Sequence, residues 1–274
     1  MSTKRKIYYH VGMGKVASTY LQYRFFPFLK NVQYLQRTHY REYPEMIESR
    51  GPQTYVLSRE FDRQMEREVK WFSEYTRDVH PIIIFRRHDS WIASQYRRFL
   101  KNGISLSFTD FIDIDNDKGF WERDEVRFMN KIKILEKYFD HKPLVLFHDE
   151  LKEDPKKFFD RIAQFVGASY DFDQIDLLPK HKSYNEKQLK VMLKLGKHIL
   201  PKGTQYSDNK TKSTFQRYGR MAIKYPILYT ARILPNRWIS KGPLIEEGEL
   251  KRIKKYYQDD WDELVAYARA NNTV

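Results

Sequence analysis

The 274-residue chain contains no cysteine. Disulfide bridges, thiolate catalysis and cysteine-based metal sites are therefore excluded. The chain also lacks any run of about 18 apolar residues, the length that a membrane-spanning helix needs. Its first residues, MSTKRKIYYHVGMG, have neither the apolar stretch nor the small-residue cleavage site of a secretory signal peptide. These absences predict a protein of a reducing compartment, and we expect the cytoplasm.

Internal repeats and low-complexity linkers are absent as well. We therefore expect one domain over residues 1–274, with a core at about 5–170 and a helical C-terminal region at about 171–274. Lysine and arginine outnumber acidic residues by 50 to 36, which gives a net charge of +14. This charge predicts attraction to anions such as nucleotides, nucleic acids, acidic glycans or anionic lipid surfaces.

Short apolar runs alternate with segments of helical periodicity through the first 170 residues. Strands are expected at 7–11, 55–58, 81–85 and 143–147, and helices at 18–29, 62–75, 90–101, 121–139 and 155–166. Because the strands are continuous apolar runs, they predict an α/β fold with a central parallel β-sheet flanked by helices. The strand signals fade after Gly167, where helices are expected at 187–200 and 246–270.

The loop after the first strand, GMGKVAST over residues 12–19, is the most informative segment. It combines two glycines and Lys15 with Ser18 and Thr19 at the start of a helix. Backbone N–H groups at a helix start, a lysine and two hydroxyls can together bind a phosphate. The alternative is a simple strand–helix turn in which Ser18 caps the helix. Since Val16 stands where GxxxxGK[ST] has a hydroxyl for Mg²⁺, the pattern indicates a phosphate loop without a metal.

A second anion site is indicated after the strand at 81–85. Arg86 follows this strand directly, at the edge where open α/β sheets bind ligands, and Ser94 comes eight residues later on the next helix. A guanidinium group and a hydroxyl can hold a phosphate monoester from two sides. Alternatively, Arg86 is a surface charge and Ser94 a neutral helical residue.

Taken together, these segments resemble the motifs of the sulfotransferases that use 3′-phosphoadenosine 5′-phosphosulfate (PAPS). GMGKVAST resembles the family pattern G-x-x-K-[ST]-[GA]-[ST]-T, and Arg86, Ser94 and Tyr96 match R-x7-S-x-Y. The blocks LFHDEL at 146–151, Asp154-Pro155 and FVGAS at 165–169 are similar to later family blocks. The resemblance covers residues 5–170. Gly14 and Val16 depart from it, since proline and a hydroxyl residue are common there.

The resemblance implies a P-loop-like sulfotransferase fold, PAPS as the donor, 3′-phosphoadenosine 5′-phosphate (PAP) as the product, and no metal. Lys15 would stabilise charge on the leaving oxygen, and Arg86 with Ser94 would bind the 3′-phosphate. The other implied donor-binding residues surround the 5′-phosphosulfate and are Gly12, Gly14, Ala17, Ser18 and Thr19. The acceptor would be an unidentified hydroxyl or amine on a glycan, lipid or small molecule.

A hydroxyl acceptor also requires a general base. Glu60 lies just beyond the second expected strand, in an S-x-E pattern that resembles bacterial members of the family. It is the first candidate, against the alternative of a surface glutamate paired with an arginine. His10, next to the loop, is the weaker candidate, against the alternative of a core histidine.

Two other functions stay open at this point. A small-molecule kinase could use the same loop, with Asp149 as its Mg²⁺ ligand. A non-enzymatic nucleic-acid binder would suit the net charge, but no helix-turn-helix, RNP or zinc pattern supports it, so we expect no nucleic-acid partner. The basic, aromatic segment at 214–241 could form an acceptor lid, contact an anionic membrane surface, or pack between helices.

Overall fold

The computed structural model describes residues 5–177, 184–199, 210–235, 239 and 241–272. Contacts divide the chain into two compact units. Unit 1 comprises Met1–Arg87, Asp124–Lys180 and Tyr257–Val274, and unit 2 comprises His88–Arg123 and His181–Tyr256. The expectation of a single domain over 1–274 stays a prediction.

Unit 1 contains a five-stranded sheet in the order β2-β3-β1-β4-β5, with every neighbouring pair parallel. Its strands are β1 (Lys6–Gly12), β2 (Gln33–Leu35), β3 (Thr54–Ser58), β4 (His80–Phe85) and β5 (Leu144–Phe147). The α/β fold with a central parallel sheet is therefore confirmed. All four expected strands are present, and β2 is an additional short strand at the edge.

The helices of unit 1 follow the expected order and, except for the helix at 155–166, which has its expected bounds, they differ in their ends. They are α1 (Ser18–Arg24), η1 (Phe26–Phe28), η2 (Arg37–Glu42), α2 (Tyr43–Arg50), α3 (Met65–Ser73), α7 (Phe128–Tyr138), α8 (His148–Glu153), α9 (Pro155–Val166), η3 (Phe172–Gln174) and α13 (Gln258–Asn271). The helix expected at 18–29 ends at Arg24, because Phe25 leaves helical geometry (φ −128°) and Pro27 follows. The helix expected at 121–139 is interrupted at Arg127, which is extended, so that α6 (Arg123–Val126) and α7 are separate.

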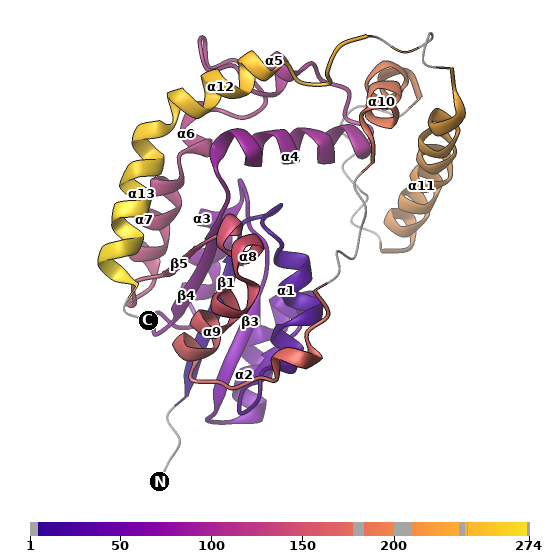
Figure 1. Cartoon of the computed structure of the whole chain (residues 1–274). Helices are drawn as coiled ribbons and strands as arrows, with labels where there is room; N and C mark the ends of the chain where they lie inside the picture. Colours follow the sequence, from indigo (N-terminus) through magenta and orange to yellow (C-terminus); the bar gives the residue numbers. More distant parts are fainter. Residues whose placement is uncertain (1–4, 178–183, 200–209, 236–238, 240, 273–274) are drawn as a thin grey trace. The chain divides into compact units, whose positions relative to one another are not determined.

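Aromatic contacts show that helices cover both faces of the sheet. Tyr8 and Tyr9 are consecutive on β1 and so point to opposite faces. The ring of Tyr8 packs edge-on against Phe165 of α9 at 5.4 Å, and that of Tyr9 against Phe72 of α3 at 5.0 Å. Helix α9 crosses in front of the strands in Figure 1. Much of the high aromatic content therefore serves the core.

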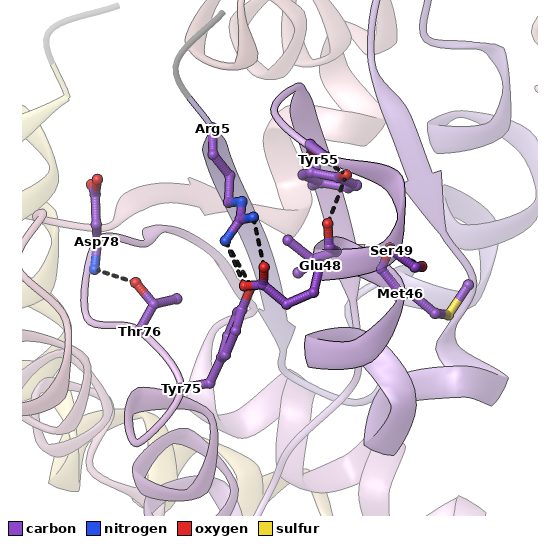
Figure 2. A network of polar contacts seen from close by, with 10 residues as sticks. Arg5, Met46, Glu48, Ser49, Tyr55, Tyr75, Thr76 and Asp78 are labelled. Atoms are coloured by element: carbon purple, nitrogen blue, oxygen red, sulfur yellow. Dashed lines mark hydrogen bonds and ion pairs between the residues drawn. The ribbon is translucent and has the colours of Figure 1, made fainter.

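A polar network fixes the amino end of β1 (Figure 2). Arg5 donates two hydrogen bonds to Glu48 of α2, of 2.7 and 3.0 Å, and the Tyr75 hydroxyl donates to the same carboxylate at 2.7 Å. The Tyr55 hydroxyl of β3 donates to the Gly51 carbonyl at 2.7 Å. These contacts connect β1, α2, β3 and the end of α3 at the edge of the sheet where the strands begin.

Unit 2 is helical. It contains α4 (His88–Lys101), α5 (Phe108–Phe111), α10 (Glu186–Ile199), α11 (Lys210–Ile233) and α12 (Glu247–Tyr256). Trp91 and Trp121 pack edge to face at 5.3 Å, and Met192 of α10 packs with Leu228 of α11. The helical C-terminal region is confirmed, although the helix expected at 246–270 is divided into α12 and α13. Leu228 lies in the segment 214–241, so its contact with Met192 agrees with the alternative in which this segment packs against other helices. Residues 236–238 and 240 of the segment lie outside the described part of the chain.

Among the residues that the structure describes, none of the helices has the length and apolar character to cross a membrane.

Candidate functional site

The loop between β1 and α1 approaches the chain after β3 too closely for a side chain at its first glycine. Gly12 has φ +127°, and a Cβ atom there would lie 3.0 Å from the backbone nitrogen of Phe61. Lys15 and Ala17 also have positive φ, of 69° and 70°. The turn from Ala17 in the left-handed region into the helical residues of α1 resembles the backbone nests that bind anions.

One side chain from the chain after β3 and one from the start of α1 hold this conformation. The Gly14 N–H donates to Asp62 at 2.9 Å, and the Ser18 hydroxyl donates to the Met13 carbonyl at 2.6 Å. Val16 is fully buried, whereas Lys15 is exposed. Burial explains the departure at Val16, since an apolar side chain suits the core. The phosphate contact expected from Ser18 stays a prediction.

Glu60 lies beside this loop. The pairing of β3 with β1 continues past Ser58, because the N–H groups of Arg59 and Phe61 donate to the carbonyls of His10 and Val11 at 2.9 and 3.0 Å. Glu60 is half-buried and accepts a 3.2 Å hydrogen bond from the Thr19 hydroxyl of α1. The structure thus brings together two residues that the sequence analysis selected separately.

His10 is in a different environment. Its ring is fully buried, and its Nδ1 lies 2.8 Å from the Ser58 hydroxyl, to which Gln22 also donates at 3.0 Å. Burial lowers the pKa of His10 to about 3, so the imidazole is neutral at physiological pH. These surroundings favour the core-histidine alternative over a role as base.

The two arginines after β4 differ in their partners. Arg87 donates to Gln258 of α13, and its guanidinium lies 5.5 Å from the ring of Trp261. Arg86 lies close enough to His148 to affect its titration: burial first, then the charge of Arg86, lowers the pKa of His148 to about 4. Arg86 is therefore at the carboxyl ends of β4 and β5, on the same edge of the sheet as the Lys15 loop.

Ser94 is half-buried on α4 in unit 2. Its expected partnership with Arg86 of unit 1 stays a prediction. Asp62, which accepts the hydrogen bond from the Gly14 N–H, was not predicted from the sequence. Its position two residues after Glu60, past the end of a strand, was the signal that could have identified it.

Comparison with known proteins gives a partial match and distant structural neighbours. No protein-family model matches the chain. A segment of 46 residues, 17% of this chain and 16% of the relative, is 39% identical to Sulfotransferase 1A1 of the dog, Canis lupus familiaris. The match therefore spans about a sixth of that relative's length.

Two solved structures are similar to the chain. A sulfotransferase from Alicyclobacillus acidocaldarius is 15% identical over 70% of this chain and 92% of that one, with a TM-score of 0.49. Mouse sulfotransferase SULT7A1, complexed with PAP, is 11% identical over 97% and 88%, with a TM-score of 0.43. The segment similar to Sulfotransferase 1A1 agrees with the family resemblance that the sequence motifs carry.

Proposed function

We propose that this protein is a PAPS-dependent sulfotransferase that transfers a sulfuryl group to a hydroxyl or amine of an acceptor. One observation carries the proposal: Lys15, Glu60 and Arg86 follow the adjacent strands β1, β3 and β4 at the same edge of the sheet. Neighbouring strands are about 4.8 Å apart, so the three groups are distributed over about 10 Å, the scale of one nucleotide.

The residues of unit 1 suit an anionic donor. Glycine at position 12 lets the backbone turn closely, and the left-handed Ala17 before α1 suits a backbone nest whose N–H groups would bind an anion. Lys15 supplies a charge, and Thr19 a hydroxyl. After the adjacent strand β4, Arg86 would bind the 3′-phosphate with its planar guanidinium group.

The reaction proposed is an in-line displacement. The acceptor oxygen attacks sulfur while the bond from sulfur to the 5′-phosphate oxygen breaks, and that oxygen keeps the electron pair and leaves on PAP. Lys15 stabilises the charge that grows on the leaving oxygen. Glu60 takes the acceptor proton. A sulfuryl group carries less negative charge than a phosphoryl group, so the lysine can serve where kinases use Mg²⁺.

The kinase alternative fits this arrangement less well. Asp149, its candidate Mg²⁺ ligand, follows β5, two strands from β1, and accepts a 2.8 Å hydrogen bond from Lys152. The position after Lys15, where a phosphate loop of kinases has a Mg²⁺-binding hydroxyl, is the buried Val16.

Calorimetry with PAP, ADP and AMP in the presence of EDTA tests the proposal. Each charge-assisted phosphate contact contributes about 1.5–3 kcal/mol, so PAP should bind about 10- to 150-fold more tightly than ADP. Arg86→Ala should remove this preference, whereas Arg87→Ala, whose side chain contacts α13, should keep it. Equal affinity of the wild-type protein for PAP and ADP would contradict the 3′-phosphate site.

Transfer of the labelled sulfuryl group from PAPS to a panel of acceptors tests the proposed catalytic activity. Lys15→Ala should lower turnover far more than PAP affinity, because the lysine faces charge that grows in the transition state. Near-normal turnover in this variant would refute the role of Lys15.

A further inference from the structure

Two histidines and an aspartate meet at the edge of the sheet where strands β4 and β5 begin. The segments Asp78-Val-His80-Pro and Asp140-His141-Lys-Pro lead directly into these strands. Because Ile82 pairs with Leu144 in parallel register, the residues before each strand arrive at the same place. This edge is opposite to the one that carries Lys15, Glu60 and Arg86.

The ligand atoms of Asp78, His80 and His141 all lie within 4.8 Å of one another. His141 Nε2 is 2.8 Å from a carboxylate oxygen of Asp78. The two imidazole rings are stacked, with centroids 3.8 Å apart and an interplanar angle of 16°. The side chains of Asp78 and His141 are 48% and 40% exposed, so an ion can reach them from solvent.

The loops that carry these residues are held to each other by side-chain and backbone hydrogen bonds of Arg77 and Asp140. Arg77 donates to the Asp140 carboxylate at 3.0 Å and to the Lys137 carbonyl at 3.1 Å. The Asp140 N–H donates back to the Arg77 carbonyl at 2.9 Å. His80 stacks on Tyr8 of β1 with a centroid distance of 4.9 Å. The three ligand residues are therefore held close together before any ion binds, and the charge of Arg77 is paired.

We propose that Asp78, His80 and His141 form a binding site for a divalent transition metal ion, with zinc as the favoured ion. Imidazole nitrogen with one carboxylate oxygen suits zinc, whereas Mg²⁺ and Ca²⁺ prefer oxygen ligands alone. Bonds of about 2.0–2.1 Å place ligand atoms no more than about 4.2 Å apart. The present spacing of up to 4.8 Å is larger, and the two stacked rings must tilt apart so that a nitrogen of each faces the ion.

In the ion-bound form, the metal replaces the proton shared between His141 and Asp78. That proton is released to solvent, and water completes the coordination. This site lies at the opposite edge of the sheet from the loop between β1 and α1. We therefore infer that the ion stabilises unit 1. This stabilisation does not depend on the proposed sulfuryl transfer.

Zinc chloride titrated into untagged, chelator-treated and dialysed protein at pH 7.5 tests this proposal by calorimetry. We expect one ion per chain and a rise in the unfolding temperature. Asp78→Asn and His141→Gln should each lower zinc affinity at least about tenfold. His39→Gln is the matched control, because His39 forms a similar exposed pair with Glu42 at 3.0 Å but is not in the cluster.

Cobalt(II) supplies a second readout, since its visible absorption reports nitrogen ligation. The spectrum should appear with the wild-type protein and with His39→Gln, and should be lost in His141→Gln. The absence of zinc binding, or equal zinc affinity in Asp78→Asn, His141→Gln and wild type, would overturn the site. PAP binding in EDTA is measured separately, so either proposal can fail alone.

Discussion

The two candidate bases show how the surroundings of a side chain determine its chemistry. His10 and Glu60 lie on neighbouring parts of the β1–β3 pair, but His10 is fully buried and Glu60 is half-buried beside the loop. A general base must come within hydrogen-bond reach of the acceptor proton. The Glu60 carboxylate meets this condition better, because it accepts a hydrogen bond from the hydroxyl of Thr19, the last residue of the GMGKVAST segment.

Glu60→Gln preserves the shape of the side chain and removes its capacity to take a proton. We expect turnover to fall by about 10²- to 10⁴-fold, the usual contribution of general base catalysis, with little change in PAP affinity. Steady-state rates and PAP calorimetry on the same preparation measure both effects. Glu74→Gln, an exposed glutamate after α3, is the control. Full activity of Glu60→Gln on a hydroxyl acceptor would remove Glu60 from the mechanism.

His10 predicts a pH dependence of stability. Its folded pKa is about 3, below the ordinary value of 6.5, so between these values the unfolded chain binds a proton that the folded chain does not. The contribution of the neutral His10 to the free energy of unfolding is therefore fully present above pH 6.5 and is lost as the pH falls toward 3. The decrease from pH 7.5 to pH 5 should be about 2 kcal/mol from this group.

Urea unfolding of wild type and His10→Gln at both pH values measures this effect. His148 and the carboxylates titrate in both proteins, so the difference between the two pH dependences isolates His10. Identical pH dependences would show that His10 is not buried as a neutral imidazole.

At the same scale, sequence motifs predicted Lys15 and Arg86 because each directly follows a strand in a recognisable pattern. Asp62, and the cluster of Asp78, His80 and His141, were not predicted. The roles proposed for them depend on contacts between residues 48 and 63 positions apart, such as Gly14 with Asp62 and Asp78 with His141. A linear pattern does not encode such contacts unless the register of the strands is known.

At the scale of elements, the turn from β1 into α1 depends on Gly12. Alanine at this position meets both an unfavourable φ of +127° and the Phe61 backbone at 3.0 Å. Gly167, after α9, also has positive φ (+72°) but has open space around it. Gly167→Ala should cost about 1–2 kcal/mol from the backbone alone, and Gly12→Ala about 1–3 kcal/mol more.

Denaturant unfolding of the two variants compares these costs, and PAP calorimetry shows whether the loop is also displaced. We expect only Gly12→Ala to weaken PAP binding. Equal destabilisation by the two substitutions would mean that the approach of Phe61 to Gly12 is not restrictive.

Element types could be predicted more fully than element ends. Continuous apolar runs such as PIIIF identified the buried strands, because a strand covered on both faces carries apolar residues on both. Strand β2 has only three residues and is half-buried at the sheet edge, so it gives no such run. The breaks at Phe25 and Arg127 arise from local backbone turns that the helical periodicity of the sequence does not reveal.

For the whole molecule, the order of the strands explains why so much of the candidate site was predictable. Parallel strands place all their carboxyl ends at one edge, so Lys15, Glu60 and Arg86 needed only to follow β1, β3 and β4. Ser94 shows the limit of this reasoning, since it lies on α4 of the other unit. Its place in the site depends on tertiary structure that the strand pattern does not specify.

The chain passes between the two units four times, after Arg87, Arg123, Lys180 and Tyr256, so neither unit is one continuous segment. Each therefore folds with its ends tethered in the other, and we expect a single cooperative unfolding transition over the 274 residues. Circular dichroism and tryptophan fluorescence should give coincident denaturation curves.

Both units contain tryptophans, so the unfolding of each unit can be followed by its own fluorescence. Of the five tryptophans, Trp71 and Trp261 fall in the ranges of unit 1, and Trp91, Trp121 and Trp238 in those of unit 2. A Trp71→Phe, Trp261→Phe double variant reports unit 2 alone, and its fluorescence midpoint should match the midpoint from circular dichroism. PAP at about 100 times its dissociation constant should stabilise the protein by about 2.7 kcal/mol and shift both signals equally. If PAP shifted only the circular dichroism curve, unit 2 would unfold separately, and the chain would consist of two domains.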